Sequence, residues 1–151
     1  MFESLQGILT GYGYVGLFLA SFLASTIIPF GSEGLLVLLV YKKFNIPALV
    51  LVASVGNFLG ACTTYYIGLK GRGFVEKYLR FDPAEIEKAE KIFFKYGPFV
   101  LLFTWLPFIG DAITVASGIL RFKFWIFSIL VFTGKFIRYL ILAYTTAVLL
   151  T

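Results

Sequence analysis

Four long apolar runs limit what this chain can fold into. They cover residues 14–40, 46–69, 98–120 and 124–150, and each is long enough to cross about 30 Å of hydrocarbon as a helix. With 60% hydrophobic residues and a mean hydropathy of +0.92, the chain is predicted to be an all-α integral membrane protein. At 151 residues we expect a single membrane domain covering 1–151.

Two carboxylates interrupt these runs at matching places. Glu33 follows Pro29 by four residues, and Asp111 follows Pro107 by the same four. A charged side chain at the centre of a membrane helix costs about 2.5–3.5 kcal/mol on insertion scales. A chain that carries this cost twice, in matching contexts, is predicted to use both groups.

The two halves of the chain resemble each other. A shift of 78 positions, from Pro29 to Pro107, aligns polar, aromatic and glycine positions without a gap. The aligned pairs include Phe30 with Phe108, Glu33 with Asp111, Lys43 with Arg121, Phe44 with Phe122, Gly56 with Gly134, Asn57 with Lys135, Phe58 with Phe136 and Tyr66 with Tyr144. We therefore expect two repeats, at about 14–69 and 97–150, joined by a polar segment at 70–96.

The basic residues predict how these repeats cross the membrane. If each Pro-acid segment is a re-entrant hairpin, residues 70–96 share one side with Arg121 and Lys123. Only Lys42 and Lys43 then lie opposite. Lysine and arginine divide nine against two among the loops, compared with seven against four if every run crosses fully. The positive-inside rule therefore favours inverted repeats, each a re-entrant hairpin followed by a spanning helix, in the plasma membrane with residues 70–96 cytoplasmic.

Proline and glycine place the hairpin breaks. The predicted break residues are Pro29, Gly31, Pro107 and Gly110, because Pro and Gly favour turns. Non-helical backbone at membrane depth is tolerated only where protein or a water-filled cavity satisfies its amides. The alternative is that Pro29 and Pro107 kink helices that span the membrane fully.

The polar segment contains an expected helix of its own. Asp82 is a suitable N-cap, followed by Pro83 at the first helical position. Apolar residues then recur at helical spacing, at Ile86, Ala89, Phe93 and Tyr96. This pattern predicts an amphipathic helix lying on the membrane surface.

Three further polar residues lie inside the apolar runs. Lys135 and Arg138 stand three positions apart in the last run, on one helix face, and Asn57 lies in the second run. Because buried charges need partners, we predict contacts between these cations and the two carboxylates. The alternative is an ion-pair network that only stabilises the fold.

These groups together suggest a function. A water-accessible pocket of this composition suits a phosphate, because Arg offers a bidentate fork and unwound backbone offers N–H groups. Our hypothesis is that Lys135, Arg138 and Asn57 bind the phosphate of a lipid that crosses the bilayer. Glu33 and Asp111 would then gate its passage or couple it to protons.

Four motifs, in order along the chain, carry a family resemblance. They are Pro29-Phe30-Gly31-Ser32-Glu33, Gly56-Asn57-Phe58-Leu59-Gly60, Tyr65-Tyr66-Ile67-Gly68 and Leu106-Pro107-Phe108-Ile109-Gly110-Asp111. Together they resemble the DedA/VTT family of membrane proteins. The Pro107 motif and residues 134–139 are most similar to its YqaA-like branch.

The resemblance implies both a fold and a function. It implies two oppositely oriented re-entrant hairpins with neighbouring spanning helices, and transport or scrambling of lipids such as polyprenyl phosphate or phospholipid. The acidic hairpin residues of the family correspond to Glu33 and Asp111. Members also commonly carry Arg three before and three after the second hairpin proline, where this chain has Thr104 and Gly110. We infer that the two cations of the last run replace them.

The composition offers little for catalysis. The chain has no His, which removes the commonest general base and metal ligand, so we expect no enzyme, no cofactor and no metal. The expected partners are anionic or phosphate-bearing membrane lipids, which a net charge of +5 suits, and a second copy of the chain in a homodimer. No nucleic acid is expected. The alternatives are a noncatalytic membrane-organising protein and, less favoured, an intramembrane enzyme acting on lipid phosphates.

Overall fold

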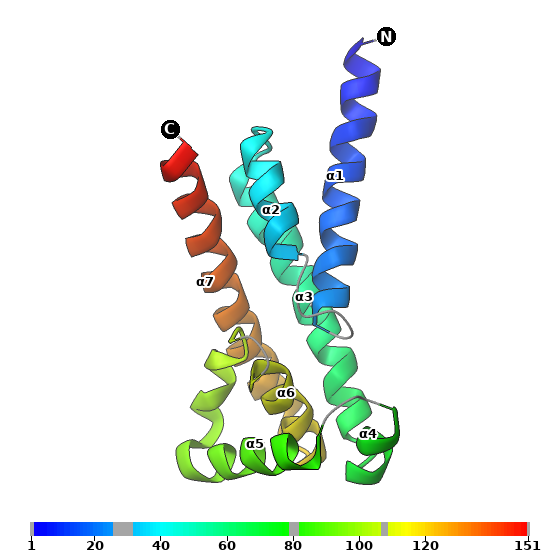
Figure 1. Cartoon of the computed structure of the whole chain (residues 1–151), viewed down its shortest axis with the longest axis vertical. Helices are drawn as coiled ribbons and strands as arrows, with labels where there is room; N and C mark the ends of the chain where they lie inside the picture. Colours follow the sequence, from blue (N-terminus) through cyan, green and yellow to red (C-terminus); the bar gives the residue numbers. More distant parts are fainter. Residues whose placement is uncertain (1, 26–31, 79–81, 107–108, 151) are drawn as a thin grey trace.

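Helices make up the described structure. The computed structural model describes residues 2–25, 32–78, 82–106 and 109–150. Its elements are α1 (Phe2–Ala24), α2 (Ser32–Tyr41), α3 (Ile46–Gly68), α4 (Arg72–Tyr78), α5 (Pro83–Tyr96), the 3₁₀ helix η1 (Gly97–Phe103), α6 (Ile109–Ile119) and α7 (Phe124–Leu150) (Figure 1). The predicted all-α fold is confirmed for this part of the chain. Pro29, Gly31 and Pro107, three of the predicted break residues, lie outside the described residues.

Two helices in the described ranges are long and apolar enough to cross a membrane. They are α3, with 23 residues, and α7, with 27. At 1.5 Å per residue they extend about 35 and 40 Å, more than the roughly 30 Å of a hydrocarbon core. Asn45 caps α3, because its side chain accepts a hydrogen bond from Ala48 N at 3.0 Å. The two helices run in opposite directions and pack against each other (Figure 1).

The other helices pair off around α3 and α7. α1 runs from the N-terminal end to about half the height of the molecule and α2 returns to that end, while η1 and α6 form a similar pair at the opposite end (Figure 1). α1 packs against α3, and η1 packs against α7. α2 packs across on α7, and α6 packs across on α3. Each long helix therefore packs mainly against one member of each pair, and α3 also touches α2.

The turns that follow α2 and α6 share one backbone structure. Lys43 and Arg121, which are 78 positions apart, both adopt the left-handed conformation, at φ 64° and 55°. Both turns close with the 6→1 backbone hydrogen bond of a Schellman motif, which joins residues five positions apart. These bonds run from Phe44 N to Leu39 O at 3.1 Å and from Phe122 N to Ser117 O at 3.0 Å. α3 and α7 each begin three residues after the left-handed residue, again 78 positions apart.

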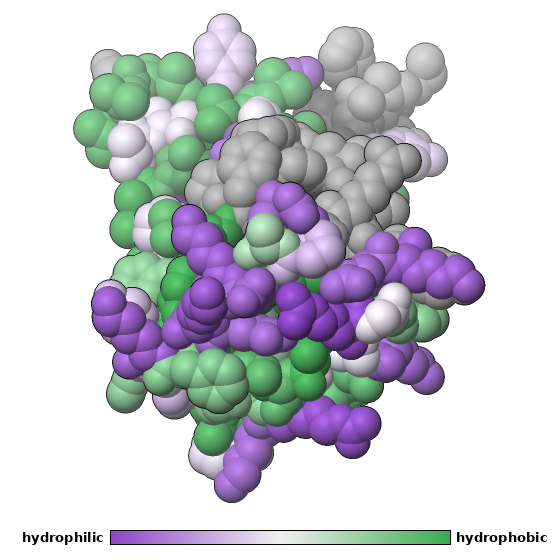
Figure 2. Space-filling model, turned by 60° about the horizontal axis from the view of Figure 1, so that its bottom comes forward, coloured by the Kyte–Doolittle hydropathy of each residue, from purple (hydrophilic) through white to green (hydrophobic). Residues whose placement is uncertain are grey.

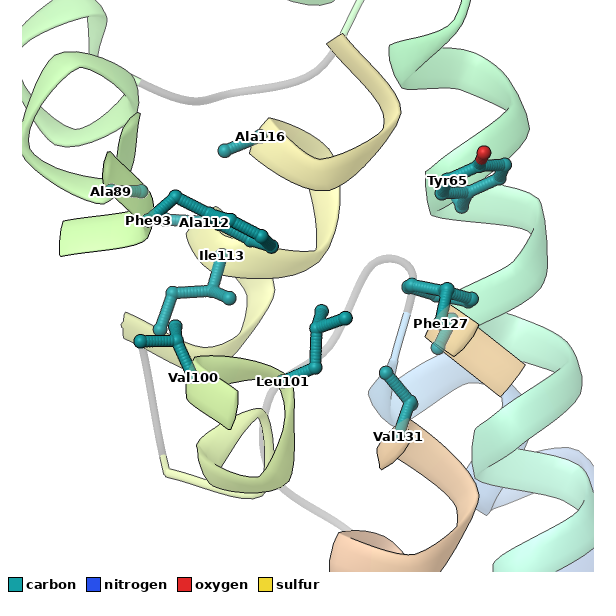
Figure 3. Packing of buried hydrophobic residues seen from close by; sticks show 11 residues of the cluster. Tyr65, Ala89, Phe93, Val100, Leu101, Ala112, Ile113, Ala116, Phe127 and Val131 are labelled. Carbon is teal, nitrogen blue, oxygen red and sulfur yellow. The ribbon is translucent and has the colours of Figure 1, made fainter. Parts of the chain in front are cut away.

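The amphipathic helix predicted in the polar segment is α5. Asp82 caps it, accepting a hydrogen bond from Ala84 N at 3.4 Å, and Ile86, Ala89 and Phe93 are buried as predicted. The helix packs on α6 and η1, partly within the apolar cluster of Figure 3. The protein itself therefore covers the apolar face that was expected to lie on a membrane, while hydrophilic residues gather at this end of the molecule (Figure 2).

Tyr96, the fourth residue of the predicted apolar face, is not packed within the protein. Tyr96 is 59% exposed, because α5 ends at this residue and Gly97 turns the chain into η1 at φ 74°. The expected stripe therefore contributes its first three positions to packing and not its fourth.

Replacing Gly56 by Ala is expected to destabilise the protein. The added carbon would lie 2.6 Å from the backbone oxygen of Phe18 in α1, and the helices would have to move apart at a cost of about 1–3 kcal/mol. Gly34→Ala is the matched control, because nothing lies within 4 Å of its added carbon and Ala favours a helix over Gly. Thermal unfolding in detergent measures both. An equal midpoint for the two variants would contradict the close approach at Gly56.

Candidate functional site

One small cavity gathers the polar residues that the apolar runs carry. Its volume is about 20 Å³, which is room for about one water molecule. Glu33, Asn57, Asp111, Lys135 and Arg138 all line it. The structure therefore brings together every charged or amide group singled out as a substrate or coupling residue, from α2, α3, α6 and α7.

Glu33 and Arg138 form an ion pair between α2 and α7. The Arg138 side chain is 21% exposed and that of Glu33 is 40% exposed. Glu33 also occupies the first turn of α2, where the helix dipole favours a negative charge. The predicted pairing of a carboxylate with a cation is therefore present, and the structure assigns it to these two residues.

Lys135 is almost fully buried, at 3% exposure. Its ammonium group donates a hydrogen bond to Asn57 Oδ1. Asn57 Nδ2 in turn donates to the backbone oxygen of Ser21 at 2.9 Å. This chain of hydrogen bonds joins α7, α3 and α1 at the cavity, and Asn57 and Lys135 are 78 positions apart.

Asp111 lines the same cavity from the first turn of α6. It forms no ion pair with any residue in the described part of the chain. Like Glu33, it lies at a helix N-terminus, which favours a negative charge. Two carboxylates and two cations thus face one water-sized space, and their charges balance.

Sequence reasoning missed other residues of this site. Trp105 and Ser32 also line the cavity, and the Ser32 hydroxyl group shares a hydrogen bond of 3.0 Å with that of Tyr139, which lies beside the cavity lining. Hydroxyl and indole groups cost much less than charges in an apolar run, so they give a weaker signal. Tyr139 lies within residues 134–139, a segment that the family resemblance had singled out, and this is the sequence signal that could have identified it.

Comparison with known proteins settles the family. A model of the VTT domain matches residues 28–148. The chain belongs to the VTT domain family. The resemblance to DedA/VTT membrane proteins is therefore confirmed. No solved structure gives a significant match.

Three relatives of this VTT protein are informative. The "Inner membrane protein YqaA" of Escherichia coli is 34% identical over 132 residues, which cover 86% of this chain and 88% of that protein. An "Uncharacterized protein" of Haemophilus influenzae is 35% identical over 139 residues, covering 85% and 83%. An "Alkaline phosphatase-like protein" of Lactococcus lactis is 28% identical over 158 residues, covering 94% and 73%. The first of these agrees with the predicted YqaA-like branch.

Local packing explains why Arg is absent from Thr104 and Gly110, the two positions where the VTT resemblance led us to expect it. Gly110 lies in the first turn of α6, and a side-chain carbon there would lie 2.6 Å from the carbonyl carbon of Thr104. Thr104 is itself 3% exposed, and its hydroxyl donates to Leu101 O at 3.0 Å. This leaves no space for a long side chain at Gly110. The cations of the cavity come from α7 instead.

Glu33 and Arg138 are expected to be strongly coupled in stability. A double-mutant cycle with Glu33→Gln and Arg138→Gln should give a coupling energy of about 1–3 kcal/mol, because each single change leaves a partly buried charge without its partner. Chemical unfolding in detergent supplies the four free energies. The control cycle uses Glu87 and Lys91 of α5, which are 3.6 Å apart and mostly exposed, and should give about 0.3–0.5 kcal/mol. Equal coupling in both cycles would contradict this assignment.

Proposed function

We propose that this VTT protein is a transporter, and not an enzyme, that moves a phosphate-bearing lipid across the plasma membrane without a cofactor. Polyprenyl phosphate and phospholipids are the substrates proposed from the family resemblance. The observation that carries the proposal is the cavity where Lys135, Arg138 and Asn57 meet two carboxylates. Ammonium, guanidinium and amide donors together suit a phosphate. The name of the E. coli relative, an inner membrane protein, supports the location.

The proposed architecture is a pair of inverted repeats, each a re-entrant hairpin followed by a spanning helix. The Schellman turns at Lys43 and Arg121, 78 positions apart, support the repeat. So does the contact of Asn57 with Lys135, also 78 apart, because two equivalent residues can touch only near the axis that relates their repeats. The half-height tips of α1 and α2 and of η1 and α6 support re-entrant hairpins (Figure 1).

This architecture sets the orientation in the membrane. α4 and α5 lie at the end of the molecule where hydrophilic residues gather (Figures 1 and 2). We place this end, with residues 70–96, in the cytoplasm on the positive-inside rule. Inverted repeats around a site near the midplane are a common plan for alternating access, which fits a cavity formed by both halves.

A phosphate has to displace Glu33 from Arg138 before it can bind. The cavity of about 20 Å³ holds one water molecule and not a phosphate group, so the ion pair fills the place of the ligand. A proton on Glu33 removes its charge and frees the guanidinium group for the phosphate. Loss of that proton restores the competitor and releases the lipid. Substrate exchange and proton exchange are therefore linked at one residue.

Two alternatives remain testable in the same preparation. A membrane-organising protein would use the ion pair only for stability, and its charge variants would leave lipid movement unchanged. An intramembrane enzyme acting on lipid phosphates is suggested by the name of the L. lactis relative and would release inorganic phosphate from its lipid. A phosphate-release assay on the same vesicles separates that activity from transport.

Glu33→Gln and Lys135→Ala are both expected to reduce lipid movement. Gln cannot regain a negative charge, so it cannot displace the phosphate from Arg138 and release the lipid. The loss of Lys135 removes a charged donor to the phosphate. Each change should lower the rate by about tenfold or more. The assay measures flipping of fluorescent phospholipid and polyprenyl phosphate in proteoliposomes. Glu87→Gln, at an exposed position of α5, is the control and should behave as wild type. Unchanged flipping in both cavity variants, with the proteins folded and inserted, would rule out the cavity as the transport site.

Lipid movement is also expected to respond to a pH gradient. Acid on the side where the labelled lipid starts should raise the initial rate, because a protonated Glu33 leaves Arg138 free to bind the phosphate. The same gradient applied in reverse should lower the rate. The residual flipping of Glu33→Gln should show no response to either gradient. A response in that variant equal to that of wild type would assign proton coupling to another group.

A further inference from the structure

A second and larger hollow opens beside the polar cavity. It has a volume of about 530 Å³ and lies between η1 and α7. Glu33, Trp105 and Arg138 line both hollows, so the ion pair lies where they meet. One side of the ion pair therefore faces the water-sized polar cavity, and the other side faces the larger hollow, which we call the groove.

The groove is apolar and open to the surroundings of the protein. Leu102 and Phe103 of η1 line one side, and Ile137 and Ile141 of α7 line the other. Phe103 is 52% exposed, Ile137 47% and Ile141 61%. In a membrane these side chains face hydrocarbon and not water. The groove is therefore a lateral opening toward the lipid.

The close approach of η1 to α7 shapes the groove. Gly134 lets η1 approach α7, since a side-chain carbon on Gly134 would collide with the backbone of Leu102. η1 ends at Phe103, whereas α7 continues past Ile141. The side chains of this later part of α7 have no turn of η1 beside them. The groove begins at this close contact and runs along α7 past Arg138.

We propose that the groove holds a hydrocarbon chain of the transported lipid while its phosphate replaces Glu33 on Arg138. This inference rests on the proposed function and adds the route of entry. An apolar wall that ends at a guanidinium group is complementary to an amphiphile with an anionic head. A neutral lipid offers nothing to displace Glu33, so it would gain no charged contact at that end.

The energetics assign different tasks to the two ends. Moving a chain from the bilayer into the groove exchanges one apolar surrounding for another, so hydrophobic burial contributes little. Affinity therefore comes from the phosphate contact with Arg138, and the groove contributes fit. Filling the groove should slow entry, while removing the phosphate should abolish selective binding.

The two tryptophans of the chain provide a direct test of binding. Trp125→Phe leaves Trp105, which lines the groove, and Trp105→Phe leaves Trp125, which is 63% exposed on another part of α7 and reports the bulk bilayer. The probe is phosphatidic acid with brominated chains, at low mole fraction in vesicles of unbrominated digalactosyldiacylglycerol, a bilayer lipid that carries no phosphate. Bromine should quench Trp105 several-fold more than Trp125. Brominated diacylglycerol, which lacks the phosphate, should quench both equally. Equal quenching of the two tryptophans by phosphatidic acid would overturn the proposal.

Flipping assays then separate this inference from the proposed function. Ile141→Trp fills the groove and should slow flipping by about tenfold. Ile129→Trp is the matched control, because Ile129 is 58% exposed on the same helix and does not line the groove. Ile137→Trp is the second groove variant if the first fails to fold. Groove variants that flip as fast as the control would overturn the groove while leaving transport intact. Selective quenching of Trp105 with no flipping by wild type would support the groove and refute transport.

Discussion

The buried ammonium group of Lys135 is the constraint around which this protein is organised. At 3% exposure it needs polar contacts, because an unsatisfied charge in a low-dielectric interior is very costly. Asn57 provides an acceptor and passes the connection on to the backbone of Ser21. The three helices α1, α3 and α7 are thereby held at one point, and the remaining charged groups are arranged around the same space.

Small residues beside this contact make the arrangement sterically feasible. Gly56 and Gly134 directly precede Asn57 and Lys135 in sequence, and both face a backbone carbonyl group of a neighbouring helix. The neighbour is Phe18 of α1 in the first case and Leu102 of η1 in the second. Both halves of the chain thus use one device, a glycine that allows close backbone approach next to a buried polar side chain. Interhelical packing in membranes commonly relies on such small residues.

The sequence predicted the members of the cavity better than their contacts. A charged residue in an apolar run is conspicuous because it is expensive, so Glu33, Asp111, Lys135 and Arg138 stood out. Which carboxylate pairs with Arg138 depends on helix packing over long sequence distances, and periodicity carries no information about that. The same limit applies to Trp105, which shares both hollows yet reads in sequence as one aromatic residue among many. The helix α5 followed from local capping and periodicity, while its burial by α6 did not.

The charge arrangement is unequal between the proposed repeats. Arg138 corresponds at the 78-position shift to Gly60, where a side-chain carbon would lie 2.7 Å from the Ser25 side chain of α1. That close packing leaves no space for a cation in the first half. Glu33 therefore has an arginine partner and Asp111 has none among the described residues. Glu33 and Arg138 line the apolar groove as well as the polar cavity, whereas Asp111 lines the cavity and not the groove. The close packing at Gly60 therefore leaves a single arginine–carboxylate pair among the described residues of the cavity, and that pair lies where the groove opens.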